Sequence, residues 1–293
     1  KDAKSSAGGL TGLFEKVGSA ASTVGKGIFT VAANVAAVSV AATTAGAAAV
    51  SALTTLAVNS YADYEQLVGG VETLYKDSAA KVQQYAADAY KTSGMTANEY
   101  MTTATSYAAA LVSSLGGDTE KAAELSNMAV SDMADNWNKF GSSADSVQAA
   151  YNGFAKGQFQ LLDNLKLGYG GTKEEMERLL DDANKLNAAQ GKYTDYSIDS
   201  FSDIILAIHD IQTEYNITGT TAKEASTTIS GSLSAAKAAW ANLVTGVADD
   251  NANFGQLISN FVDSATTAAS NIIPRVEVAL NGAAKLIESL VPP

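Results

Sequence analysis

Apolar residues recur at spacings of three and four along most of the chain, which is the periodicity of one face of an α-helix. A typical stripe consists of Ile204, Ile208, Ile211 and Tyr215. No segment alternates apolar and polar positions over a length that would predict a β-strand. The pattern therefore predicts an all-α protein whose helices pack through apolar stripes.

The first predicted segment, residues 1–60, is rich in alanine. It contains most of an uncharged run that extends from Gly27 to Ala62. Its apolar positions alternate spacings of four and three, a repeat of 3.5 residues that is typical of a left-handed coiled coil. The repeat consists of Val17, Ala21, Val24, Ile28, Val31, Val35, Val38, Ala42, Ala45, Ala49, Ala52 and Leu56. We expect a long alanine-rich N-terminal helix here.

Three roles stay open for this helix. It fits a coiled-coil rod, although it lacks the charges that usually flank a coiled-coil seam. It also fits a helix buried in its own domain. Residues 27–62 are, in addition, longer than the ~20 residues that cross a bilayer. The third role is therefore a membrane-inserting or pore-forming segment, although alanine and threonine are only weakly apolar.

The second predicted segment, residues 61–231, shows helix start signals between short connections that contain glycine or asparagine. Capping boxes, in which a hydroxyl and a carboxylate satisfy the first free N–H groups of a helix, are predicted at three places. The pairs are Thr96 with Glu99, Thr172 with Glu175, and Thr221 with Glu224. Another helix is predicted to begin at Asp118 or Thr119, after two glycines. These signals predict a compact helical domain.

The third predicted segment, residues 232–293, is again alanine-rich and amphipathic. Its apolar stripes are Leu233, Ala236, Trp240, Leu243 and Val247, and then Leu257, Ile258, Phe261 and Val262. Pro274 is predicted to break the chain, because proline has no N–H to donate within a helix. The last predicted stripe is Val276, Leu280, Ala284, Ile287 and Val291. We expect amphipathic C-terminal helices here.

Composition narrows the function classes. The 293 residues carry a net charge of −12, and the basic residues are scattered along the chain. Direct nucleic-acid binding is therefore not expected, because such binding depends on cations that neutralise phosphates. The chain has no cysteine, which excludes disulfides and thiolate metal sites. It begins without methionine, so we expect it to be a piece of a longer protein.

The glycine cluster Gly168–Lys173 is the strongest candidate for a phosphate-binding loop. A P-loop needs a strand, then Gly-x-x-x-x-Gly-Lys-Ser/Thr, then a helix. Here the order is reversed to Thr172-Lys173, and the preceding residues have helical spacing. Acidic residues follow at once and would repel phosphate. The pattern therefore favours a helix N-terminus over a nucleotide site.

Catalytic chemistry is sparse. The chain has a single histidine, His209, which we interpret as a structural or surface residue. The acid pairs Asp181-Asp182 and Asp249-Asp250 are adjacent residues, and on a helix such neighbours point in different directions. The second pair lacks the spacing of a calcium loop. We predict no catalytic residue, no cofactor and no metal site, and hence no enzyme.

Several long blocks carry a resemblance to a known family. They include "YADYEQLVGGVETLY", "LVSSLGGDTEKAAELSNMAVSDMADNWNKFGSS", "LDNLKLGYGGTKEEMERLL" and "IQTEYNITGTTAKEASTTISGSLSAAKAAWANLVTG". With further blocks, they run in order from about Tyr61 to Leu290. These blocks resemble the tape measure proteins of long-tailed phages and prophages of Gram-positive bacteria. The resemblance covers most of the chain, and the glycine cluster belongs to one of the blocks.

The resemblance implies a structural role. A tape measure protein is a mostly helical chain, present in several copies, that fills the lumen of the growing phage tail and sets its length. It is expelled at DNA ejection and is thought to help form a channel across the host envelope. The implied partners are tail tube subunits, tail tip or initiator proteins, tail assembly chaperones and further copies of the chain. The implied locations are the virion tail and the host cytoplasm during assembly, with the host membrane and envelope at ejection.

Overall fold

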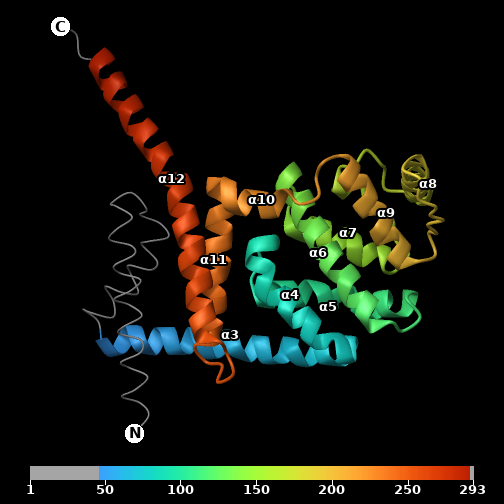
Figure 1. The fold of residues 1–293 in the computed structure, drawn as a ribbon, viewed down its shortest axis with the longest axis horizontal. Coiled ribbons are helices and arrows are strands. Elements are labelled where there is room, and N and C mark those ends of the chain that lie inside the picture. The colour runs from blue at the N-terminus through green and yellow to red at the C-terminus, as the bar shows by residue number, and fades with distance from the viewer. Residues whose placement is uncertain (1–45, 291–293) are drawn as a thin grey trace. The chain divides into compact units, whose positions relative to one another are not determined.

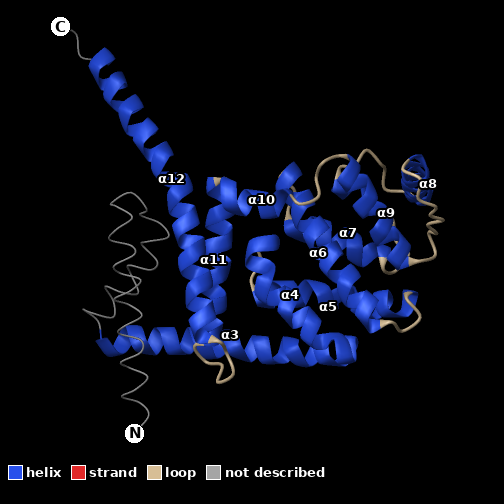
Figure 2. Ribbon diagram, in the orientation of Figure 1, coloured by secondary structure: helices blue, strands red, loops and turns tan. Residues whose placement is uncertain are grey.

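Helices account for nearly all of the regular structure in the computed structural model, which describes residues 46–290 (Figure 1). Within that range the chain forms no strand, as the colouring in Figure 2 shows. The predicted all-α fold class is thereby confirmed. Residues 1–45, which include most of the predicted coiled-coil or membrane-inserting segment, lie outside the described residues. So does Val291 of the last predicted stripe.

The helices follow one another through mostly short connections. Their bounds are α3 Gly46–Tyr75, η1 Lys76–Ser78, α4 Ala79–Thr92, α5 Ala97–Ser114, α6 Thr119–Phe140, α7 Ala144–Phe154, η2 Leu162–Leu165, α8 Lys173–Ala189, α9 Phe201–Glu214, α10 Thr220–Thr227, α11 Ile229–Gly246 and α12 Phe254–Leu290. The elements η1 and η2 are short 3₁₀ turns.

Contacts divide the described residues into two compact units. The central unit is Ala62–Lys223, and the terminal unit combines residues 46–61 with residues 224–290. One boundary falls within α3 and the other within α10. Residues from the first and third predicted segments therefore contribute to the same unit.

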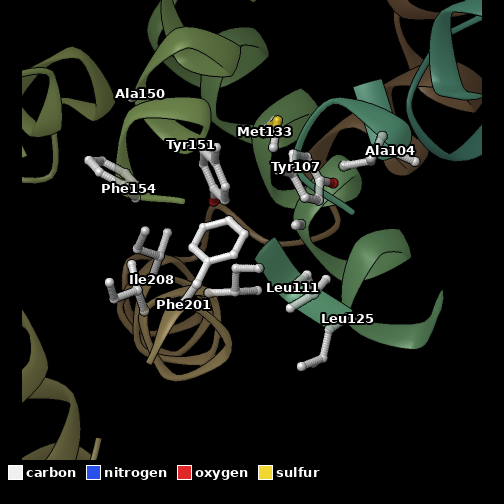
Figure 3. Close-up of a cluster of buried hydrophobic side chains, with 14 of the residues drawn as sticks. Ala104, Tyr107, Leu111, Leu125, Met133, Ala150, Tyr151, Phe154, Phe201 and Ile208 are labelled. Carbon is white, nitrogen blue, oxygen red and sulfur yellow. The ribbon is translucent and has the colours of Figure 1, made fainter. Parts of the chain in front are cut away.

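The central unit is built around α6. Residues Asp132–Asn136 are all buried, so this stretch of α6 has no solvent-facing side. Such a helix is enclosed by other helices, and α6 packs against α4, α5, α7 and α9. Figure 3 shows the apolar part of this core, where Tyr107 and Phe201 approach edge to face, with ring centroids 5.8 Å apart. The core thus joins elements that are distant in the sequence.

Two of the predicted helix starts are confirmed in full. At α5, the Thr96 hydroxyl accepts the Glu99 N–H and the Glu99 carboxylate accepts the Thr96 N–H, at 3.1 and 2.8 Å. At α6, the helix begins at Thr119, and the Asp118 carboxylate accepts the Lys121 N–H at 3.0 Å. Both caps satisfy N–H groups that have no partner within the helix.

One predicted stripe is shorter than expected. Ile204, Ile208 and Ile211 are buried on α9, as predicted, but Tyr215 is half exposed. The reason is that α9 ends at Glu214, so Tyr215 follows the helix instead of continuing its apolar face.

The terminal unit contains an antiparallel pair formed by α11 and the first part of α12. The Trp240 and Phe261 rings pack with centroids 5.2 Å apart. At the other end of the pair, the Asn271 amide donates to the carbonyl groups of Ser226 and Thr228. The Ser60 and Thr245 hydroxyls share a hydrogen bond of 2.5 Å, which brings α3 to α11.

The prediction that Pro274 breaks the chain is wrong, because α12 continues through it from Phe254 to Leu290. A proline inside a helix removes the hydrogen bond to the carbonyl four residues earlier, here that of Ser270. Both Pro274 and Ser270 are exposed, so water can satisfy that carbonyl. The proline therefore costs one helical hydrogen bond without ending the helix.

Candidate functional site

The most unusual feature of the central unit is a row of buried polar side chains on α6. Asp132, Asp135 and Asn136 are only 1%, 2% and 1% exposed. Buried carboxylates are costly unless hydrogen bonds or opposite charges compensate them. The partners of these three residues therefore show which elements the buried polar row connects.

Asp132 is paired with the single histidine of the chain. His209 Nδ1 lies 3.0 and 2.9 Å from the two carboxylate oxygens of Asp132, which joins α9 to α6. The His209 side chain is 28% exposed, so solvent reaches it while Asp132 stays buried. The Gln212 amide donates to the Asp132 carbonyl from the next turn of α9, at 3.4 Å.

The pair perturbs the protonation of both groups. Burial raises the pKa of Asp132 to about 6, against the opposing hydrogen bond and charge of His209. The hydrogen bond to Asp132 raises the pKa of His209 above its ordinary value, against its partial burial. The folded state therefore retains protons at this pair more strongly than separated side chains would.

Asn136 extends the row toward the loop between α7 and α8. Its amide donates to the Leu165 carbonyl at 2.9 Å and to the Gln212 side-chain oxygen at 3.2 Å. Its own side-chain oxygen has no partner. The Tyr151 hydroxyl, which is also buried, has none either, and the charges of Asp132 and Asp135 contribute to a raised pKa that is caused mainly by burial.

Asp135 caps a helix that lies far along the chain. Its two carboxylate oxygens accept the N–H groups of Gly219 and Thr221, at 2.6 and 2.7 Å, at the start of α10. The predicted capping box of Thr221 with Glu224 is wrong, because α10 begins at Thr220 and Thr221 lies inside it. The side chain that takes the free N–H groups comes from α6 instead.

The glycine cluster is held by the chain's own side chains. The Thr172 hydroxyl accepts the Glu175 N–H at 3.2 Å, as the predicted capping box requires. The second half of that box is wrong: the Glu175 carboxylate accepts the Gly170 N–H at 2.9 Å, not that of Thr172. Arg178 explains the difference, because its ion pair with Glu175, at 2.6 Å, holds the carboxylate on the loop side of the helix.

Arg178 also fixes the rest of this loop. Its guanidinium lies 4.3 Å from the centroid of the Tyr169 ring, within the range of a cation–π contact, and donates to the Gly168 carbonyl at 2.9 Å. The Tyr169 hydroxyl donates to Asp182. The Gly170 N–H, which a phosphate would need, is already bonded to Glu175. The loop is therefore held by contacts with side chains of α8.

The candidate acid pairs are held by contacts within the chain. Asp181 pairs with Lys185 at 2.5 Å. Asp182 accepts the Tyr169 hydroxyl and lies 3.8 Å from both Lys185 and Arg178, so Lys185 contacts both carboxylates. Asp249 accepts the Asn251 N–H in the turn that follows α11. Within residues 46–290, no group of three or more His, Cys, Asp or Glu side chains could hold a metal ion.

Sequence reasoning missed the buried row on α6. It interpreted His209 as a structural or surface residue but did not identify its partner Asp132, which lies 77 positions away in the chain. The one signal in the sequence was spacing: Asp135 and Asn136 lie three and four positions after Asp132, which places all three on one side of α6. What they bind could not be read from that spacing.

No protein-family model, no curated protein and no solved structure matches this chain. No helix in the described part of the chain is long and apolar enough to cross a membrane. The buried row joins α6 to α9, to α10 and to the loop before α8. These contacts hold elements of the central unit together.

Proposed function

We propose that this chain is a segment of a phage tail tape measure protein, a structural protein that sets tail length during tube assembly and leaves the tail at DNA ejection. The observation that carries the proposal is the ordered series of sequence blocks between Tyr61 and Leu290. The proposed partners are tail tube subunits, tail tip or initiator proteins, tail assembly chaperones and further copies of the chain. Catalysis is not part of the proposal.

The helical architecture supports this role in physical terms. An α-helix lengthens by 1.5 Å per residue, so a helical chain converts residue number into distance. By this rise, the 37 residues of α12 extend about 55 Å and the 30 residues of α3 about 45 Å. Helices of this length are consistent with a ruler.

The charge distribution is also consistent with a protein that DNA must follow through a narrow tube. The central unit carries 23 acidic and 12 basic residues, a net charge of −11, and so accounts for nearly all of the −12 of the whole chain. A surface of this sign repels the phosphate backbone and does not retain DNA. The chain would therefore leave the tube without holding the DNA behind it.

The test is the tail length of a phage whose parent gene carries an in-frame deletion in the helical rod outside this segment. Electron microscopy should show tails shortened by about 1.5 Å for each deleted residue. A matched variant with the same number of conservative substitutions at those positions should keep the parental length. Tails of unchanged length in the deletion phage would refute the proposal.

A further inference from the structure

The contact between Asp132 and His209 has a geometry in which one proton can change how strongly α9 is attached to α6. Asp132 is buried on the central helix α6, and its carboxylate meets His209 through both oxygens. His209 is partly exposed, so it can exchange a proton with solvent while it stays in contact with Asp132. A buried carboxylate next to a solvent-accessible imidazole forms a switchable ion pair.

We propose that the Asp132–His209 pair is a proton-operated latch: protonated His209 holds α9 against α6, and loss of its proton loosens α9. The physical reason is the cost of an uncompensated charge. While His209 is protonated, its positive charge offsets the buried carboxylate of Asp132. When the proton leaves, Asp132 keeps its negative charge in a site without a cation, and such a charge is strongly destabilising.

Within the described residues, no other ionisable group that acts on the pair replaces the lost charge. The ionisable groups that act on it are Asp135 on α6, Asp210 on α9 and Tyr151 on α7. Two of these are carboxylates, and the buried tyrosine stays neutral because burial raises its pKa well above the ordinary value. The nearby field is therefore negative, and it increases the need for the positive charge of His209.

The loosened part of the fold would include α8 as well as α9. Asp210, next to His209, points to α8, where it accepts the Asn187 amide at 2.5 Å, and it also accepts the Tyr196 hydroxyl at 2.9 Å. These contacts do not involve His209. Helices α8 and α9 therefore stay joined to each other while the attachment of α9 to α6 weakens.

The direction of the pH effect follows from both shifted groups. The pKa of Asp132 is raised to about 6 and that of His209 is also raised, so the folded state binds more protons than the unfolded state. The stability that the pair contributes therefore falls as pH rises, first toward pH 6 and then through the raised pKa of His209. Because one proton is released at His209, the opening equilibrium of α9 can rise by at most about tenfold per pH unit.

The single histidine makes the test direct. In the full chain, every imidazole proton resonance in the NMR spectrum belongs to His209, so its titration gives the pKa without assignment. The same samples give protection factors, which are corrected for intrinsic exchange, for the amides of α9 and α4. Asp132→Asn removes the carboxylate, and Asp195→Asn, in the exposed loop before α9, is the matched control for loss of one negative charge.

The latch predicts a His209 pKa above 6.5 in the natural chain and in Asp195→Asn, and a value closer to 6.5 in Asp132→Asn. It also predicts that α9 protection falls across the His209 titration while α4 protection does not. A His209 pKa at or below 6.5 in the natural chain would overturn the proposal. So would unchanged α9 protection across the titration. Both results come from the natural chain, so the test holds even where Asp132→Asn does not fold.

Discussion

The cap that Asp135 provides to α10 gives the sharpest prediction about stability. The carboxylate is 2% exposed and accepts two N–H groups, those of Gly219 and Thr221, at 2.6 and 2.7 Å. Asp135→Asn keeps the size of the side chain but replaces one oxygen with an NH₂ group. One of the two N–H groups then faces a donor in place of an acceptor.

The expected loss can be worked out from these contacts. A hydrogen bond to a charged group contributes about 1.5–3 kcal/mol, and a buried N–H without a partner costs about 1–3 kcal/mol. Removal of the buried charge recovers part of this cost, because an amide is easier to bury than a carboxylate. We therefore expect Asp135→Asn to lower the unfolding free energy of the central unit by about 2–4 kcal/mol.

The two tryptophans allow the central unit to be measured separately. Trp137 lies on α6 in the central unit, and Trp240 lies on α11 in the terminal unit. In a Trp240→Phe background, fluorescence during urea unfolding reports Trp137 alone. The change in unfolding free energy is then the difference between the Asp135→Asn chain and its parent in that background.

The reasoning fails if Asp135→Asn changes the unfolding free energy by less than about 1 kcal/mol, because one charged hydrogen bond alone should exceed that amount. Asp195→Asn is the matched control, since it removes the same charge from an exposed loop. We expect the control to change stability by less than about 0.5 kcal/mol, as is usual for surface substitutions.

Three further substitutions test packing. Gly171→Ala should destabilise the central unit by about 1–3 kcal/mol, because the new Cβ would lie 2.9 Å from the Gln160 carbonyl carbon and closer still to its oxygen. Gly69→Ala is its counterpart inside α3, where a Cβ meets nothing within 4 Å, and it should stabilise the unit by about 0.5–1 kcal/mol in the same urea assay. Phe261→Ala removes the ring that packs on Trp240, so the unfolding transition reported by Trp240 should lose about 3–5 kcal/mol. In Phe261→Ala, the unfolding transition reported by Trp137 on α6 should not move. A parallel shift of both transitions would contradict independent unfolding of the two units.

Local signals in the sequence predicted the parts of the fold that depend on neighbouring residues. The capping box of Thr96 and Glu99 and the buried stripe Ile204, Ile208 and Ile211 are set by spacings of three and four within one helix. The all-α class follows from the same periodicity. These features need no knowledge of what packs against them.

The errors occur where a distant or competing partner decides. The carboxylate of Glu175 turns to Gly170 because Arg178 draws it there, and the α10 cap comes from Asp135, which is 86 positions from Thr221. The pairing of His209 with Asp132 spans 77 positions. A pattern within one helix cannot show which buried polar groups meet across the fold, so the candidate site emerged only from the structure.

Under the tape measure role proposed above, a folded central unit limits how much length the chain can add to a tail. Fully helical and extended, residues 62–223 would contribute about 240 Å at 1.5 Å per residue. Folded around α6, residues 62–223 would add a length on the order of that one helix, whose 22 residues extend about 33 Å. Because the unit has a continuous buried core, we expect an in-frame deletion of residues 62–223 to shorten the phage tail by about 30–40 Å in electron micrographs. A shortening near 240 Å would show that the core opens when the chain enters the tube, and that the folded unit is a state of the free protein only.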